Sequence, residues 1–358
     1  MTNNPVSFMK KNFTDWFNSK TKGTNVNSVF VTPCEDTHPD FKILMDNGVR
    51  IFKECQWGEV IRREDFCILQ VTSDEKEYFL YWHMGLEPKQ TQAEFDIGLD
   101  EDDCHFLLKL AFYTSCNFEP TSTLDDLITN GVVFESDLIS RLPYIQVLSL
   151  AKKHANENIN IKEIRVLLYV ELLDSRHYYL YEYIIELALS LPEKDHDWLY
   201  YEIIRAIRSK NQDSVFLCLY KMLEFFFPLN NVFALSGSIN FGGSLLKLLE
   251  HCKQDLNWNV NHNYGLRSTK EYGSHHFAHY LGYDTSSVEL ITDNEDKKKK
   301  IDSIKSEALE KISKLRHKLT HQNFCVTDVS YDEILNSTIA ITIFLTESFR
   351  EYGNRIKS

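Results

Sequence analysis

The chain has 358 residues, of which 43% are apolar and 25% are charged, and its formal net charge is −13. This composition excludes an intrinsically disordered chain, and the acidic balance disfavours a protein that coats nucleic acid nonspecifically. No apolar stretch of signal-peptide type precedes the first lysines, and the longest apolar run, 215–227, is interrupted by Lys221 and Glu224. We therefore expect a cytoplasmic protein with no membrane-spanning segment.

The N-terminal region, 1–102, is predicted to be a β-rich domain with a sensor or binding role. Apolar and polar residues alternate there, and Asn-Gly is a turn pair that tolerates the positive φ of a tight hairpin. The predicted strands are the two runs around Asn47-Gly48 in 41–53, followed by 66–72, 77–84 and 93–99. The acidic run 100–103 is expected to open a helix, because acidic side chains favour the first helical turn.

From about residue 103 onward the chain is predicted to be almost entirely helical, because apolar residues recur at spacings of three and four. The predicted helices before the last two are 135–155, 161–175, 178–191, 197–209 and 213–228. We expect a helical middle region, 103–195, and then a helical bundle, 196–358, with an irregular insertion at 229–291 that holds one short helix. The expected fold class is α+β, with the β-containing region first and the all-α bundle last.

Two capping boxes mark the last two helices. Thr292 and Glu295 would start a helix that runs to about residue 320, and Ser330 and Glu333 would start the final helix, which Gly353 would end. A core-facing stripe is predicted along the first of these helices, at Ile301, Ile304, Ala308, Ile312, Leu315 and Leu319.

The stretch "KISKLRHKLTHQ" (311–322) places Arg316, His317, Thr320 and His321 at the end of this core-packed helix. A guanidinium binds phosphate oxygens through a planar fork, and an imidazole can accept or deliver a proton near neutral pH. Together these groups would cleave RNA without a metal, since the imidazole would act on the 2′-hydroxyl or the leaving 5′-oxygen. The requirement for a 2′-hydroxyl would restrict the reaction to RNA.

A bundle whose penultimate helix ends in R-x4-H, with a polar residue after the arginine, resembles the HEPN superfamily. The resemblance covers about residues 196–358 and implies that Arg316 binds the scissile phosphate, His321 is the acid or base, and His317 fills the polar position. The aromatic-rich segment 216–228 resembles the early helix of that family, whose acidic residue would be Glu224. Thr320 and Lys318 are the expected supporting residues.

This resemblance also implies a biological setting. Many HEPN proteins are metal-independent endoribonucleases of toxin, abortive-infection and antiviral defence systems, and they commonly dimerise so that two R-x4-H motifs face one RNA. We therefore expect an RNA substrate and a homodimer, with a regulatory partner or trigger acting through the N-terminal domain. The basic run Lys297, Lys298, Lys299 and Lys300 would contact the RNA backbone.

Two other interpretations of these residues remain open. In the first, Arg316, Lys318 and the histidines only complement the negative end of the helix dipole, and the bundle is a non-catalytic dimerisation or interaction module. In the second, the H-x-x-x-H pairs bind zinc; these are His317 with His321 and His275 with His279. Lys318 and His276 follow the first histidine of each pair, where a metalloprotease has glutamate, so we expect no metal and no cofactor.

Overall fold

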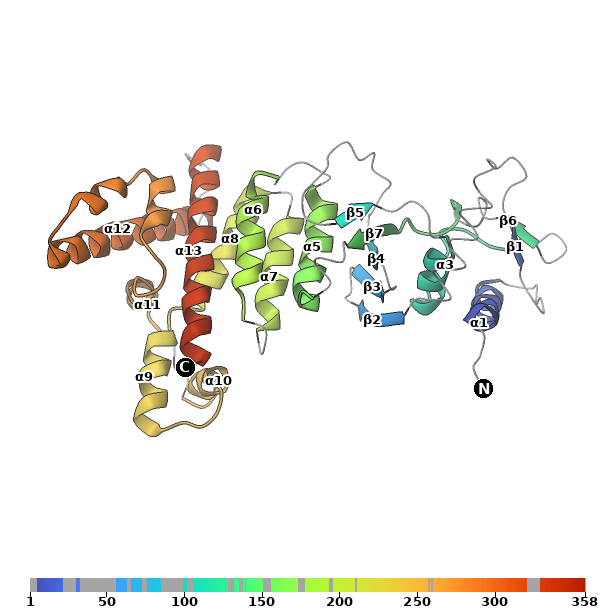
Figure 1. The fold of residues 1–358 in the computed structure, drawn as a ribbon, viewed down its shortest axis with the longest axis horizontal. Coiled ribbons are helices and arrows are strands. Elements are labelled where there is room, and N and C mark those ends of the chain that lie inside the picture. The colour runs from blue at the N-terminus through green and yellow to red at the C-terminus, as the bar shows by residue number, and fades with distance from the viewer. Residues whose placement is uncertain are drawn as a thin grey trace. The chain divides into compact units, whose positions relative to one another are not determined.

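A computed structural model describes residues 5–21, 30–32, 56–62, 66–72, 76–84, 99–101, 106–125, 127, 132–134, 138, 140–150, 156–172, 178–192, 196–209, 211–256, 258, 260–320 and 329–357. The chain divides into two compact units, 1–157 and 158–358 (Figure 1). The first unit contains the sheets and the second is helical, which confirms the α+β class. The division lies inside 103–195, for which the sequence predicts one helical region.

An antiparallel five-stranded sheet forms the centre of the first unit. In spatial order its strands are β2 (Gln56–Arg62), β3 (Phe66–Thr72), β4 (Glu77–His83), β7 (Gln146–Leu150) and β5 (Leu99–Glu101). Two short strands pair in parallel, β1 (Phe30–Thr32) and β6 (Val132–Phe134). Helices α1 (Pro5–Lys20) and α3 (Phe106–Ser115) contact each other, and their aromatic residues join a core cluster with the sheet.

The predicted hairpin of 66–72 and 77–84 is confirmed, because β3 and β4 pair from Phe66 opposite His83 to Thr72 opposite Glu77. The other predicted hairpin, 41–53, lies outside the described residues, as do residues 93–98 of the predicted fifth strand. The prediction that a helix begins at 100–103 is wrong. Asp100 and Glu101 belong to β5 and pair with β7, and the described helix begins at Phe106.

The helix predicted over 135–155 is also wrong, because this segment contains β7. All five residues of β7 are buried, including the polar Gln146 and Ser149. A strand that is buried on both faces has a continuous apolar run in place of alternation, and such a run cannot be distinguished from a buried helix by periodicity.

The second unit is built of helices, several of which lie side by side (Figure 1). Its elements are α5 (Ile159–Leu172), η2 (Tyr178–Leu180), α6 (Tyr181–Ser190), α7 (Asp197–Arg208), α8 (Gln212–Glu224), α9 (Leu229–Ile239), α10 (Leu245–Gln254), α11 (His262–Thr269), η3 (His276–Leu281), η4 (Ser286–Leu290), α12 (Asn294–Thr320) and α13 (Tyr331–Lys357). Helix α13 contacts α6, α8 and α12, and α7 contacts both α5 and α8. The four helices predicted at 161–175, 178–191, 197–209 and 213–228 are therefore confirmed, with small shifts at their ends.

The segment 229–291 is more regular than the sequence predicts. Its described residues form three α-helices and two 3₁₀-helices, where one short helix was expected. The expected helix is α10, and its N-terminal Ser244 accepts a hydrogen bond from the backbone N–H of Lys247 at 3.3 Å. The four that were missed are α9, α11, η3 and η4. Helix α8 ends at Glu224, and α9 begins directly after the turn at 225–228 with Pro228 at its N-cap.

Two predicted helix ends need correction and one is confirmed. The cap of α12 is Asp293, whose Oδ1 accepts from the N–H of Asp296 at 2.9 Å, so Thr292 is not the capping residue. Helix α13 continues past Gly353 to Lys357. Ser330 does cap α13, since its Oγ accepts from the N–H of Glu333 at 3.1 Å.

The apolar stripe of α12 faces the core, as predicted. Its buried members are Ile304, Ala308, Ile312, Leu315 and Leu319, and Ile301 is half-buried. One helical stretch of the described residues, 212–239, is long and apolar enough to cross a membrane by length and composition alone. About 67% of its apolar window is buried inside the unit, and buried core helices of soluble proteins pass the same test.

Truncation of a core leucine in α13 is expected to test this packing. Leu345 has no exposed surface, whereas Leu290 is 83% exposed, so the two positions compare the same chemical change in two environments. We expect Leu345→Ala to lower the free energy of unfolding by ~2–5 kcal/mol and Leu290→Ala to change it by less than ~0.5 kcal/mol. Urea denaturation of the full chain measures both, and equal losses would contradict the packing described here.

Candidate functional site

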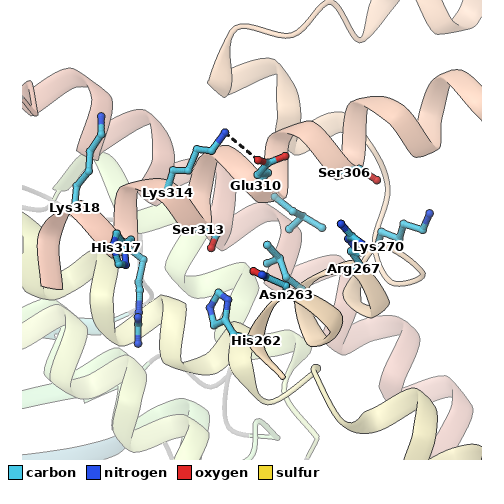
Figure 2. A pocket seen from close by; sticks show the side chains of 13 residues that line it. His262, Asn263, Arg267, Lys270, Ser306, Glu310, Ser313, Lys314, His317 and Lys318 are labelled. Carbon is cyan, nitrogen blue, oxygen red and sulfur yellow. Dashed lines mark ion pairs between the residues drawn. The ribbon is translucent and has the colours of Figure 1, made fainter. Parts of the chain in front are cut away.

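A groove of about 940 Å³ lies between α11 and the C-terminal half of α12 (Figure 2). Figure 2 shows His262 of α11 and Ser313 and His317 of α12 directed toward the same space. The lining of α12 follows one helical face, with residues at 306, 309, 310, 313, 314 and 317. The two helices therefore supply a groove lined by both polar and apolar side chains.

The groove is rich in basic side chains, although the chain as a whole is acidic. Five of its lining residues are basic: Arg267, Lys270, Lys314, Arg316 and Lys318. Among the described residues that line it, one is acidic: Glu310, whose Oε1 lies 2.9 Å from Nζ of Lys314. That ammonium lowers the pKa of the Glu310 carboxyl, so the carboxylate stays ionised. Glu224 and Glu333 lie within 4 Å of Arg316 and Lys318, so three of the five positive charges have a carboxylate beside them. Such a surface attracts an anion that is extended or multiply charged.

Arg316 is held by two groups of α8. Its Nη2 lies 3.7 Å from Oε1 of Glu224, and its Cζ lies 5.8 Å from the centre of the Tyr220 ring. Both side chains of the ion pair are about one-third exposed, so the guanidinium is oriented without being shut away from solvent. The predicted phosphate-binding residue and the predicted acidic residue of the early helix are therefore neighbours.

Close packing fixes α11 against the turn that follows α8. A Cβ built on Gly265 would lie 2.5 Å from side-chain atoms of Phe227, so only glycine permits this approach. The Ser268 hydroxyl donates to the carbonyl of Phe227 at 3.0 Å, and the side-chain oxygen of Asn261 caps the first turn of α11. These contacts fix the first residue of the helix, His262, at the edge of the groove.

His262 is oriented by a buried tyrosine. Its Nε2 lies 2.8 Å from the Tyr220 hydroxyl, and burial raises the pKa of this phenol to about 12. The phenol therefore keeps its proton at neutral pH and donates to Nε2, which places the proton of a neutral imidazole on Nδ1. Among the described residues no hydrogen bond to Nδ1 is made, so in this tautomer the Nδ1–H can donate a hydrogen bond to a ligand in the groove.

The other predicted residues at the helix end have different positions. His317 lines the groove and is exposed. Lys318 lines the groove as well, and its Nζ lies 3.6 Å from Oε1 of Glu333 in α13. The Thr320 hydroxyl donates to the main-chain carbonyls of Arg316 at 2.9 Å and His317 at 3.3 Å, so it is used within the helix. His321 lies outside the described residues, and its predicted role stays a prediction.

The basic run at the start of α12 does not line the groove and is far from Arg316. Between 16 and 19 residues separate these lysines from Arg316, which is about 24–28 Å along a helix. Nζ of Lys297 lies 3.0 Å from Oε2 of Glu289, and Nζ of Lys299 lies 3.7 Å from Oδ1 of Asp296. Lys298 and Lys300 are exposed, and none of the four lysines lines the groove. The structure does not bring them together with Arg316.

The second histidine cluster is separate from the groove. His275 is buried, its ring lies 4.6 Å from that of His276, and burial lowers the pKa of the His275 imidazole. His279 is exposed on η3. Within the part of the chain that the structure describes, no three His, Cys, Asp or Glu side chains group as metal ligands.

Sequence reasoning missed most of the groove. Lys314 and Ser313 precede His317 by three and four residues, so helical spacing alone could have placed them on its face. Tyr220 and His262 are 42 residues apart, and no local pattern links them. Arg267 and Lys270 lie in the segment that was taken to be irregular. No protein-family model, curated protein or solved structure matches the chain.

The raised pKa of Tyr220 predicts a specific alkaline behaviour. The pKa of this phenol is about 12 in the folded chain and 10 in an ordinary tyrosine. The contribution of the protonated phenol to the free energy of unfolding is therefore complete below pH 10 and is lost as the pH rises toward 12. We expect Tyr220→Phe to lose less unfolding free energy than the wild type between pH 9 and pH 11. Urea denaturation at both pH values measures this, and equal losses would contradict the assignment.

Proposed function

We propose that the groove of the second unit binds and cleaves RNA, and that this unit is an endoribonuclease of HEPN type. The observation that supports this most is the convergence of Arg316, His262 and His317 on one groove rich in basic side chains. A nuclease needs a cation that binds the phosphate and groups that transfer protons near neutral pH. These three side chains supply both.

The reaction that suits these groups is a transesterification. The 2′-oxygen of the substrate forms a bond to phosphorus while the bond from phosphorus to the 5′-oxygen breaks. One imidazole accepts the proton of the 2′-hydroxyl, and a second, protonated imidazole delivers a proton to the leaving 5′-oxygen. The Arg316 guanidinium stabilises the charge that develops on the phosphoryl oxygens. Protons balance, and no metal takes part in the scheme.

The HEPN assignment rests on the position of Arg316. The resemblance places an arginine at the end of the penultimate helix and an acidic residue on an early helix, and Arg316 lies beside Glu224 of α8. The proposal includes the homodimer, in which a second copy brings another R-x4-H helix end to the RNA, and a trigger that acts through the first unit. A role in antiviral defence or as a toxin follows from the resemblance alone.

Incubation of the purified full chain with total RNA tests this function. We expect fragments with 2′,3′-cyclic phosphate ends that form equally well in EDTA. A chain that binds RNA in a salt-dependent manner but never cuts it would favour the alternative, a non-catalytic interaction module. Cleavage that requires added divalent metal would contradict the proposed chemistry.

A further inference from the structure

A second, smaller cavity opens beside the groove. Its volume is about 250 Å³, below the ~300–1,000 Å³ of pockets that enclose drug-sized ligands. His262 lines both cavities, and Glu224 lines the small one while pairing with Arg316 of the groove. A nucleotide whose phosphate meets Arg316 would therefore have its base beside this small cavity.

The walls of the small cavity suit a flat ring. Trp258, Pro228 and Val260 supply apolar surface. Trp258 is itself held in place, since its backbone N–H donates to the carbonyl of Cys252 at 3.0 Å and its side chain packs on the buried cluster of α9 and α10. An indole with a fixed position stacks on a nucleobase at a small entropic cost.

Two charged groups line the same cavity and define which base edge fits. Glu224 offers carboxylate oxygens that only accept hydrogen bonds, and Lys253 offers an ammonium that only donates them. Guanine presents two adjacent donors, N1–H and the N2 amino group, next to the O6 acceptor. The carboxylate would accept from both donors while the ammonium donates to O6. Uracil has one donor on this edge and adenine has no carbonyl acceptor.

We propose that this cavity is a guanine-binding subsite, which makes the substrate a single-stranded RNA with an unpaired guanine next to the scissile phosphate. The inference rests on the proposed RNA function for its biological meaning. Stacking requires an unstacked base, so a duplex would not present its guanine to the cavity. Binding of a guanine nucleotide itself requires no cleavage.

Titration calorimetry of the full chain with mononucleotides tests the subsite without any catalytic readout. We expect guanosine 5′-monophosphate to bind at least about tenfold more tightly than uridine 5′-monophosphate, and ribose 5-phosphate to bind most weakly. Trp258→Leu should reduce the affinity for the guanine nucleotide by about ten- to a hundredfold and leave ribose 5-phosphate unchanged. Trp198→Leu is the matched control, because Trp198 is a partly exposed tryptophan of α7 outside the cavity.

A second variant, Glu224→Gln, keeps the side-chain size and removes the acceptor-only carboxylate, so the preference for guanine over uracil should fall severalfold or more. Equal affinity of the wild type for all three ligands would overturn the subsite, and so would an unchanged preference in Glu224→Gln. Guanine selectivity in a chain that cuts no RNA would support the subsite while the nuclease proposal fails. RNA cleavage by a chain without guanine selectivity would leave the nuclease proposal standing and overturn the subsite alone.

Discussion

Arg316→Ala is expected to lower the rate of RNA cleavage by about 10²–10³-fold, because removal of one group that stabilises transition-state charge typically costs that much. The guanidinium reaches the groove from a position fixed by Glu224 and Tyr220, so a lysine at 316 would keep the charge and lose the planar fork. We therefore expect Arg316→Lys to recover only part of the activity. Single-turnover cleavage of a short fluorescent RNA measures both variants.

Arg350→Ala is the matched control for this experiment. Arg350 also pairs with a glutamate, Glu186, at 3.7 Å, which equals the distance of the pair at Arg316, but it lies on α13 and does not line the groove. Circular dichroism and thermal unfolding of all variants would show that each is folded. Equal activity of Arg316→Ala and Arg350→Ala would remove the arginine from the reaction and favour the non-catalytic module.

Local features of the fold could be predicted because their physical cause is local. The stripe of α12 follows from spacings of three and four, and the β3–β4 hairpin follows from two short apolar runs separated by a polar turn. The cap of α12 shows the limit of such reasoning. Thr292 and Asp293 are both good capping residues, and only the backbone geometry determines that Asp293 caps the helix.

The candidate site could be predicted only in its helical half. Arg316 and His317 lie on one segment with a recognisable helix end, and Glu224 was assigned to the early helix from its aromatic surroundings. The other half depends on contacts between distant segments. Gly265 lets α11 approach Phe227, and this approach brings His262 to Tyr220. Neither a glycine in a short helix nor a lone histidine indicates such a contact in a sequence.

The groove therefore offers a second imidazole that the R-x4-H pattern does not include. Arg316 interacts with the face of the Tyr220 ring, and the hydroxyl of the same tyrosine hydrogen-bonds His262. One buried side chain thus sets the positions of the phosphate-binding cation and of a proton-transfer group. Tyr220→Phe keeps the ring face that Arg316 contacts and removes the hydroxyl that His262 contacts, so this variant tests the positioning of His262 and not direct chemistry.

His262→Ala is expected to lower the cleavage rate by about 10²–10⁴-fold, the range for loss of a general acid or base. It should also remove one limb of the dependence of kcat on pH, as expected when a general acid or base is lost. Tyr220→Phe should lower kcat by a smaller factor and leave KM nearly unchanged, because Nε2 of His262 loses its hydrogen-bond donor while the imidazole still lines the groove. Stopped-flow cleavage between pH 5 and pH 9 measures these effects.

His251→Ala is the control, because His251 is hydrogen-bonded to Asp255 at 2.9 Å but lies on α10, away from the groove lining. His321→Ala completes the comparison, because the HEPN resemblance assigns the acid or base to that residue. If both His262→Ala and His321→Ala are inactive, each with a different limb of the pH profile removed, the two imidazoles divide the roles of acid and base. If only His321→Ala is inactive and His262→Ala matches His251→Ala, the reaction uses the R-x4-H pair alone and His262 has a structural role.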